Sequence, residues 1–340
     1  MTSPRPRVAL TLGDVAGIGP EVVARALNDD RLRLACDVAV VGHPEVLHRA
    51  LALISAKIAI AQVGSLADVD WSPQSVACVN PSTDEAAHVP VGKIDARAGR
   101  AAYDYLVAAT RSALRGELDV ITTAPLNKAA LHEAGLNFPG HTEILAKECG
   151  VSEFAMMLYL PPGEPLRGPF GLGVAHVTLH TSIRSVPGLL TISGISETIQ
   201  LVDVFLRRIG CSSPRVGVCA LNPHAGEEGL FGDEESTLIA PAVKQATQLR
   251  INATGPIPAD ALLRRAVMGE FDGVVAMYHD QGHIALKLIG FERAVNVTLG
   301  LPIVRTSPSH GTAFDIAWQG HARAEGFIEA VLTGVKLAKS

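Results

Sequence analysis

FDGVVAMYHDQGH, residues 271–283, is the stretch that decides the fold. Its first half is apolar and rich in β-branched residues, as in a buried strand, and its second half turns polar within a few residues. A buried strand that ends in a polar turn before a helical stretch is one βα unit of an α/β protein. His279 and Asp280 would then lie at the carboxyl end of that strand.

The same pattern recurs along the chain. Apolar runs are followed by Ala- and Leu-rich stretches with helical spacing, such as residues 20–29 and 100–117, and this alternation predicts the α/β class with largely parallel sheets. Residues 161–171, PPGEPLRGPFG, are typical of a loop or hairpin. The predicted strands lie in RVALTL, DVAVVG, LDVITTAP, LGVAHVTL, RVGVCALN and FDGVVAMYHD.

Length and composition favour a well-buried enzyme with two lobes. The chain has 340 residues, 48% of them hydrophobic and 19% charged, with a net charge of -5. A single core stops growing near ~250–300 residues, which is why two lobes are expected. The charge balance excludes a disordered chain and a nucleic-acid-binding surface.

The cysteines and the N-terminus indicate a cytoplasmic protein. Five cysteines without CxxC spacing, an odd number, favour free thiols in a reducing compartment. The apolar run near the N-terminus meets Asp14 and is too short for a secretory segment or a membrane span.

Polar residues follow nearly every predicted strand. In α/β sheets, ligands bind outside the carboxyl ends of the strands, where helix N-termini present free N–H groups. Residues at these positions are therefore candidates for a site: Asp14, Thr122, Thr123, His180, Asn222, His224, His279 and Asp280.

Three of these positions are histidines from separate βα units. Neutral imidazoles that converge from loops commonly hold a divalent metal with one position left for substrate, so His180, His224 and His279 predict a metal site. The alternative is that each is an ordinary polar residue at a strand end. His283 shares a helical face with His279 and is a second ligand, a supporting partner or a surface residue.

The loop LNPHAGEEGLFGDEE, residues 221–235, surrounds His224 with glycines. Glycines allow close approach of backbone to a ligand, although a plain turn before the next helix would look the same. Asn222 and His224 are the candidates here, and the glutamates are interpreted as surface residues.

Two further segments predict an anion site. A helix begins near His141 and Thr142, where free N–H groups favour an anion; an ordinary capped helix is the alternative. Lys287, Asn296 and Arg305 could clamp a phosphate or carboxylate, whereas surface salt bridges would also explain the two cations.

Residues 11–23, TLGDVAGIGPEVV, do not match a dinucleotide-binding fingerprint. Gly17 and Gly19 follow a strand, but Val22 stands where a third small residue is needed, and Pro20 begins a helix instead.

Eight motifs, in order over almost the whole chain, resemble the 4-hydroxythreonine-4-phosphate dehydrogenase family: GDVAGIGPEVV, APLNKAALHEAG, GHTEILA, LNPHAGEEGLFGDEE, GPIPAD, MYHDQGH, VNVTLGLPIVRTS and HGTAFDIA. The first also resembles isopropylmalate and isocitrate dehydrogenases. The resemblance implies two α/β/α lobes with the active site in the cleft between them. We expect residues 1–125 plus 300–340 in the first lobe, and 126–299 in the second, with most metal and substrate residues.

The resemblance also implies an activity. It is the NAD- or NADP-dependent oxidation and decarboxylation of a phosphorylated 3-hydroxy acid, as in pyridoxine biosynthesis, by a homodimer with a metal site shared between subunits. The family's metal ligands match His180, His224 and His279. Its substrate contacts match His141, Thr142, Lys287, Asn296 and Arg305.

The substrate within the family stays open. HVTLHTSIRS and HDQGHIALKLIGF are closer to the branch that oxidises D-threonate 4-phosphate or D-erythronate 4-phosphate than to the enzyme acting on 4-phosphohydroxy-L-threonine. The metal would lower the pKa of the reacting alcohol, and zinc suits three imidazoles, with magnesium, manganese or cobalt as alternatives. Asp280 and Asp260 are candidates for the general base.

Two other functions fit the same residues. A metal-dependent hydrolase or acyltransferase would use the histidines without a nicotinamide. A non-catalytic sugar-phosphate-binding protein would use only the anion site.

Overall fold

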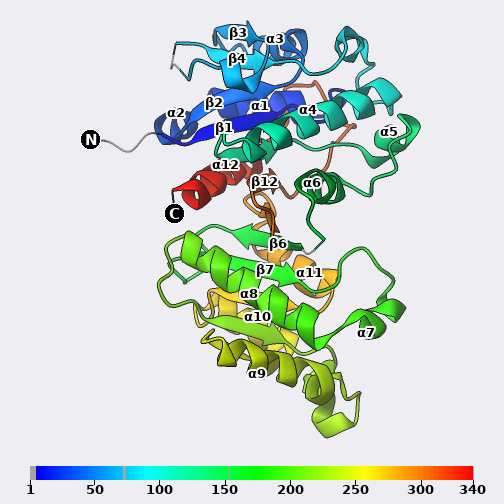
Figure 1. Cartoon of the computed structure of the whole chain (residues 1–340), viewed down its shortest axis with the longest axis vertical. Coiled ribbons are helices and arrows are strands. Elements are labelled where there is room, and N and C mark those ends of the chain that lie inside the picture. Colours follow the sequence, from blue (N-terminus) through cyan, green and yellow to red (C-terminus); the bar gives the residue numbers. More distant parts are fainter. Residues whose placement is uncertain (1–4, 72–73, 153, 340) are drawn as a thin grey trace. The chain divides into compact units, whose positions relative to one another are not determined.

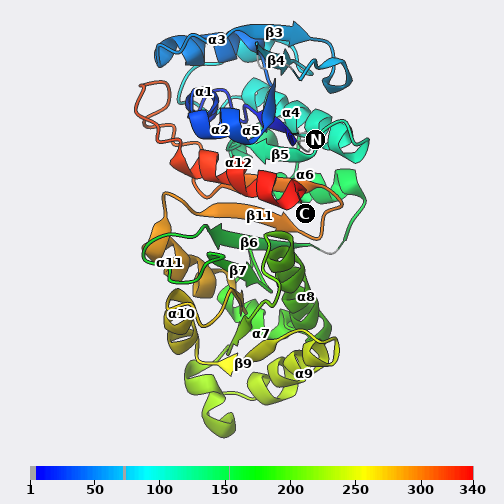
Figure 2. The ribbon, with the colours of Figure 1, turned by 90° about the vertical axis from the view of Figure 1, so that its left-hand side faces the viewer.

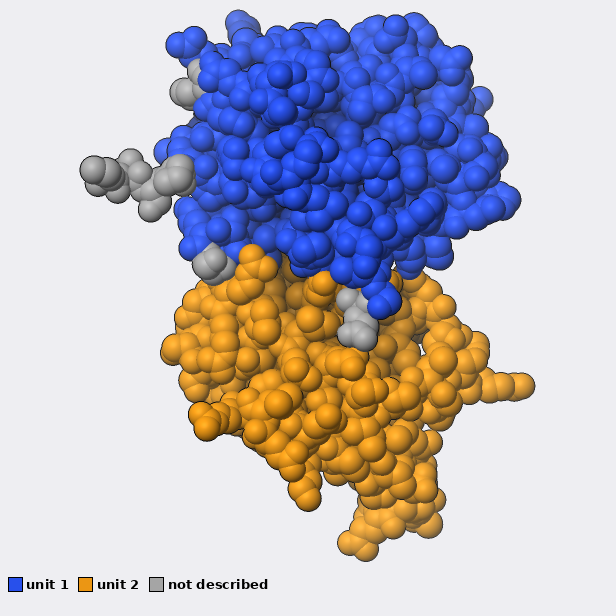
Figure 3. All heavy atoms as spheres, viewed as in Figure 1, with its two compact units in different colours: residues 1–152, 301–339 blue, residues 153–300, 340 orange. Residues whose placement is uncertain are grey.

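The computed structural model describes residues 5–71, 74–152 and 154–339 (Figure 1). The chain divides into unit 1, residues 1–152 with 301–339, and unit 2, residues 153–300 (Figure 3). We expected the first segment to end at residue 125, whereas the structure keeps residues 126–152 in unit 1. The reason is that α5 (Lys128–Glu133) and α6 (His141–Cys149) pack against α4 (Ala96–Leu114).

Unit 1 contains a parallel sheet with the strand order β3-β4-β2-β1-β5-β12. Helix α4 packs on β1 and β5, α12 packs on β5 and β12, and the inner strands are buried along their length. The strands are β1 (Arg7–Thr11), β2 (Asp37–Val41), β3 (Ile60–Val63), β4 (Val76–Val79), β5 (Val120–Thr123) and β12 (Val304–Pro308). The other helices are α1 (Gly19–Leu27), α2 (Asp30–Ala35), α3 (Pro44–Leu53) and α12 (Glu325–Ala338), with short turns at Leu66–Asp68 and Asp84–His88.

Unit 2 contains a mixed sheet with the order β11-β6-β7-β10-β8-β9. Strand β6 is antiparallel to both of its neighbours, and β7, β10, β8 and β9 are parallel. Figure 2 shows α10 and α11 on one face of this sheet and α8 and α9 on the other. The strands are β6 (Ala155–Leu160), β7 (Leu172–His176), β8 (Val216–Cys219), β9 (Ala253–Ile257), β10 (Gly273–Ala276) and β11 (Val295–Leu299). The helices are α7 (Val186–Leu189), α8 (Ile192–Arg208), α9 (Ala240–Gln248), α10 (Ala259–Val267) and α11 (His279–Gly290), with short turns at Ile183–Ser185, Pro223–Gly229 and Glu235–Ile239.

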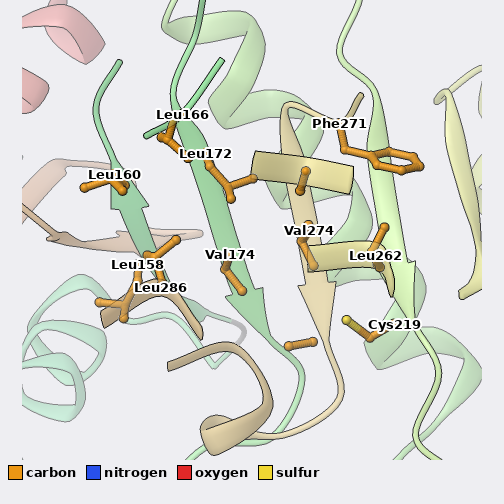
Figure 4. Close-up of a cluster of buried hydrophobic side chains, with 12 residues drawn as sticks. Leu158, Leu160, Leu166, Leu172, Val174, Cys219, Leu262, Phe271, Val274 and Leu286 are labelled. Atoms are coloured by element: carbon orange, nitrogen blue, oxygen red, sulfur yellow. The ribbon is translucent and has the colours of Figure 1, made fainter. Parts of the chain in front are cut away.

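The core of unit 2 lies between the sheet and α10 and α11. Side chains from β6, β7 and β10, among them Leu158, Val174 and Val274, pack against Leu262 and Leu286 of the two helices (Figure 4). Burial of each such side chain contributes roughly 1.5–3 kcal/mol, so the strand ends that carry the candidate residues are firmly held.

The predicted α/β class with largely parallel sheets is confirmed, and each of the six predicted strand runs contains a strand. Residues 161–171 connect the antiparallel pair β6 and β7, as expected of a hairpin. All five cysteines are free thiols.

Within the described ranges, no single helix has the length and apolarity needed to cross a membrane. The segments Ile183–Leu189 and Ile192–Arg208 pass that test only as a pair, bent by 94°.

Candidate active site

Three predicted site residues lie beyond parallel strands of unit 2. His180 follows β7, His224 follows β8, and His279 begins α11 directly after β10. Because β7, β10 and β8 run parallel, their carboxyl ends lie at one edge of the sheet. The fold therefore brings all three loops to the same edge.

His180 and His279 line one pocket of about 710 Å³ at this edge, with their ring centroids 5.8 Å apart. Tyr278, Asp280 and Ile284 contribute to its wall. Two of the three predicted metal ligands therefore meet within one chain.

Asp280 fixes which nitrogen of His279 carries the proton. Its Oδ1 lies 2.6 Å from Nδ1 of His279, and a carboxylate oxygen accepts, so Nδ1–H donates. The Nε2 atom then keeps its lone pair. Imidazoles that bind metals are commonly oriented by a carboxylate in this way, which supports His279 as a ligand.

A buried histidine pair supports His279 from below. His176 is 1% exposed and its Nδ1 donates to the Met156 carbonyl at 3.2 Å, so its Nε2 accepts from Nδ1 of His283 at 3.1 Å. The His283 ring stacks on His279 with centroids 3.7 Å apart. A Cβ at Gly282 would lie 2.6 Å from Nε2 of His176, so only glycine admits the pair.

Both supporting imidazoles are neutral at pH 7. Burial lowers the pKa of His176 to about 4, and burial together with His176 and His279 lowers the pKa of His283 to about 2. The interpretation of His283 as a surface residue is wrong, because its ring is enclosed beneath α11. His176 is not among the site residues predicted from the sequence. Its position at the end of an apolar strand could have indicated that it lies near the site.

His224 lies on a strained turn. It is exposed, and residues 224–228 all have positive φ angles between 43° and 80°. Four of the five are not glycine, and each left-handed residue of that kind costs roughly 1–2 kcal/mol. Among the described residues, no group of three His, Cys, Asp or Glu side chains is placed to hold a metal ion, so the histidine trio is not assembled within one chain.

The glutamates of loop 221–235 are not all surface residues. Glu227 and Glu228 are exposed as predicted, but Glu235 is 6% exposed. The surface interpretation is wrong for Glu235 because the loop folds back over its carboxylate.

Gln281 links two of the strand ends. Its Oε1 accepts from the Met277 N–H at 2.7 Å, and its Nε2 donates to the Ala220 carbonyl at 2.7 Å. The ends of β10 and β8 are therefore tied together. No motif or spacing in the sequence predicts this bridge.

In unit 1, Arg305 and His141 lie at the end of β5. Arg305 is 2% exposed in β12 and its Nη2 donates to Thr123 Oγ1 at 2.7 Å, so the alternative of a surface salt bridge is wrong for this residue. Nε2 of His141 donates to the Ala124 carbonyl at 3.2 Å, and Thr142 follows in the first turn of α6. Burial lowers the pKa of Arg305 to about 9, and burial and the Arg305 cation hold the pKa of His141 well below its usual value.

Asp14 lies at the same edge of unit 1. Its backbone N–H donates to the Pro125 carbonyl, and its Oδ1 accepts from the Ala16 N–H at 2.9 Å. Oδ2 is buried and has no hydrogen-bond partner among the described residues. Burial raises the pKa of Asp14 to about 6.

Three further predicted residues, Lys287, Asn296 and Asp260, lie in unit 2. Lys287 is on α11 with Nζ 5.8 Å from the Phe291 ring, and Asn296 is on β11, where its Oδ1 is buried without a hydrogen-bond partner among the described residues. Asp260 is exposed in the first turn of α10. The residues of the predicted clamp are therefore distributed over both units.

Comparison with known proteins gives consistent matches over the whole chain. The family described as pyridoxal phosphate biosynthetic protein PdxA matches residues 34–334. The D-threonate 4-phosphate dehydrogenase of Salmonella typhimurium is 42% identical over 332 residues, 97% of this chain and 98% of the relative. The 4-hydroxythreonine-4-phosphate dehydrogenase of Geobacter metallireducens is 41% identical over 343 residues, 100% of this chain and 97% of the relative.

A solved structure agrees with these matches. The 4-hydroxythreonine-4-phosphate dehydrogenase from Klebsiella pneumoniae is 42% identical, with a TM-score of 0.84 over 98% of this chain and 99% of that chain. These relatives are named dehydrogenases. The names favour an oxidoreductase over the alternatives of a hydrolase, an acyltransferase or a non-catalytic binding protein.

Proposed function

The chain belongs to the PdxA family and is an oxidoreductase, and from this premise we propose that it oxidises a short phosphorylated hydroxy acid with NAD or NADP as the hydride acceptor. The observation that carries the proposal is the pair His180 and His279 in one pocket, with Asp280 holding Nδ1 of His279. Such a pair can bind the reacting end of a hydroxy acid through a metal.

The preferred substrate in this proposal is D-threonate 4-phosphate. The Salmonella relative of that name is 42% identical, and the HDQGH motif with His283 resembles the same branch of the family. D-erythronate 4-phosphate and 4-phosphohydroxy-L-threonine are the other substrates to compare. Oxidation at C3 would give a 3-keto acid, which loses carbon dioxide readily because the resulting enolate is stabilised by nearby positive charge.

The donor set fits a divalent metal. His180, His279 and His224 would hold it as neutral imidazoles, a set that favours zinc, with magnesium, manganese or cobalt as alternatives. When bound, such a metal polarises the substrate hydroxyl and lowers its pKa. Asp280 orients His279 in this scheme, and Asp260 stays a candidate for the general base.

A second copy of the chain completes the metal site in this proposal, because only two of the three imidazoles meet within one chain. Ile284 and Leu288 on α11 are 58% and 84% exposed, and Phe291, directly after the helix, is 52% exposed. Ile284 also lines the pocket of His180 and His279. Leu230 and Phe231, on the loop of His224, are also exposed. An apolar patch of this kind is typical of an interface in a homodimer.

In this proposal the phosphate end is bound by the residues of the predicted clamp, His141, Thr142, Lys287, Asn296 and Arg305. A buried guanidinium presents a planar fork that suits phosphate oxygens. Anchoring the remote phosphate would fix the hydroxyl near the imidazoles. The free thiols fit a reducing, cytoplasmic location.

The direct test is an assay of the purified protein with NAD and with NADP. The three phosphorylated acids are supplied in parallel, and reduced nicotinamide is followed by absorbance before and after chelation and metal replacement. We expect turnover with at least one acid, loss on chelation and recovery with a divalent metal. No reduced nicotinamide with any of the acids would refute the proposal.

A further inference from the structure

The turn that carries His224 needs an anchor. Residues 224–228 form a left-handed turn, and His224 is its first residue, directly after Pro223. The side chain of His224 is exposed, so its own packing does not hold the turn in place. Contacts elsewhere in the loop must therefore fix its conformation.

Glu235 supplies these contacts. Its Oε1 accepts from the backbone N–H of Leu221 at 2.8 Å and of Asn222 at 2.7 Å, and its Oε2 accepts from Nδ2 of Asn222 at 3.0 Å. Nδ2 of Asn222 also donates to Glu234 at 2.7 Å. The carboxylate of Glu235 thus holds both residues that precede Pro223.

The turn itself closes over the same carboxylate. A Cβ at Gly226 would lie 2.7 Å from Oε2 of Glu235, and Gly226 has a φ of 80°. The N–H of Phe231 donates back to the Gly226 carbonyl at 3.1 Å. One buried side chain therefore bonds the residues before the turn and lies against its middle residue.

We propose that Glu235 is a positioning residue, which holds the left-handed turn so that the His224 imidazole is presented to the metal. This inference rests on the proposed function, which places His224 among the metal ligands. Gln281 extends the same support, because it ties Ala220, the residue before Leu221, to the strand end that precedes His279. Hydrogen bonds of Glu235 and Gln281 therefore connect the loop that carries His224 to the strand end before His279.

The first measurement needs no metal. Amide hydrogen exchange of the metal-free full chain is compared for the wild type, Glu235→Gln and the matched control Glu228→Gln, an exposed glutamate in the same loop. We expect the Leu221 and Asn222 amides to exchange about tenfold faster in Glu235→Gln only, because the neutral amide weakens their hydrogen bonds and its nitrogen cannot accept from Nδ2 of Asn222. Unchanged exchange would overturn the proposal.

The second measurement uses Co²⁺ alone as the probe. Dissociation constants come from chelator competition, and the visible spectrum of the saturated protein reports on the coordination geometry. We expect Glu235→Gln to bind roughly 10- to 100-fold more weakly with an altered spectrum, and Glu228→Gln to match the wild type. Wild-type affinity and spectrum in Glu235→Gln would overturn the positioning role.

Two further variants separate the possible failures. If Glu235→Gln no longer melts cooperatively, Asn222→Ala decides: weaker Co²⁺ binding supports the role of Glu235, and unchanged binding overturns it. His224→Ala tests the proposed function, since wild-type Co²⁺ affinity in this variant would remove His224 from the metal site and the inference with it. Weak binding by His224→Ala together with normal binding by Glu235→Gln would overturn the inference alone.

Discussion

Arg305 in unit 1 is 2% exposed and donates to Thr123, whereas His180 and His224 in unit 2 are exposed on loops beyond their strands. At the unit 1 edge, Arg305 and His141 are held by hydrogen bonds to Thr123 and Ala124 within the folded chain. At the unit 2 edge, a single chain brings together only two of the three predicted ligands, His180 and His279. Under the proposed function, the arginine and histidine at the unit 1 edge would be in place after folding, whereas the metal site would be complete only after assembly.

The strongest test of this contrast uses hybrid dimers. His224→Ala and His279→Ala should each lower turnover by about 10³-fold or more through metal loss, since a Lewis-acid metal supplies several kcal/mol, while both variants still melt cooperatively. If the site is shared, a hybrid purified with one tag on each variant regains one intact site. We expect about half of the wild-type activity.

The homodimers of each variant, carrying the same tags, are the controls. A hybrid as inactive as both parents would show that the three imidazoles act within one chain. A mass of one chain on gel filtration under assay conditions would also contradict a shared site.

The next test concerns the loss of stability caused by burying the carboxyl group of Asp14 at the unit 1 edge. The native pKa of Asp14 is about 6, above the ordinary 3.8, so the folded state holds a proton that the unfolded state has released. The contribution of Asp14 to the free energy of unfolding is therefore most favourable below about pH 4. As the pH rises from about 4 to about 6, this contribution falls by about 3 kcal/mol in total. Asp14→Asn should lack this fall.

Urea unfolding of both proteins across this pH range provides the measurement, with Asp70→Asn at an exposed carboxylate as the control. Parallel curves for the wild type and Asp14→Asn would show that Asp14 titrates normally in the folded protein.

Arg305→Ala should weaken the binding of the phosphorylated substrate. Loss of a charge-assisted, two-pronged contact costs roughly 1.5–3 kcal/mol, which raises KM by about 10- to 100-fold. The dephosphorylated analogue should be affected much less. Arg265→Ala, which breaks an exposed ion pair with Glu270, is the matched control. An equal loss for both substrates would remove Arg305 from the phosphate site.

The smallest effect is expected for Asp280→Asn. The amide oxygen can still accept from Nδ1 of His279, so metal affinity should fall only about tenfold, and saturating metal should restore kcat. If Asp280 is instead the general base, kcat stays low at any metal concentration and one limb of the pH profile is lost. The metal dependence of kcat therefore distinguishes the two roles.

Local patterns predicted the framework because they depend on neighbouring residues. Pro20 lies in the first turn of α1, and His141 begins α6, as the sequence indicated. The strand exits at His180 and His279 follow from the switch between apolar and polar residues. These features need only local propensity and burial.

Tertiary contacts lay beyond the sequence. Glu235 stands in an acidic run that is typical of a surface, and only folding of the loop encloses it. Gln281 and His176 contact residues 61 and 107 positions away, which no spacing rule addresses. The boundary at residue 152 rather than 125 likewise depends on how α5 and α6 pack on α4.

Gly282 offers a way to alter the proposed metal site without replacing one of its proposed ligands. A methyl group there would meet Nε2 of His176 and Cγ1 of Val174, each at 2.6 Å. The opening turn of α11 would have to lift from the sheet, and His279 would move with it. Gly282→Ala is therefore expected to lower metal affinity by displacing His279, and position 282 is a suitable site for changing the metal preference.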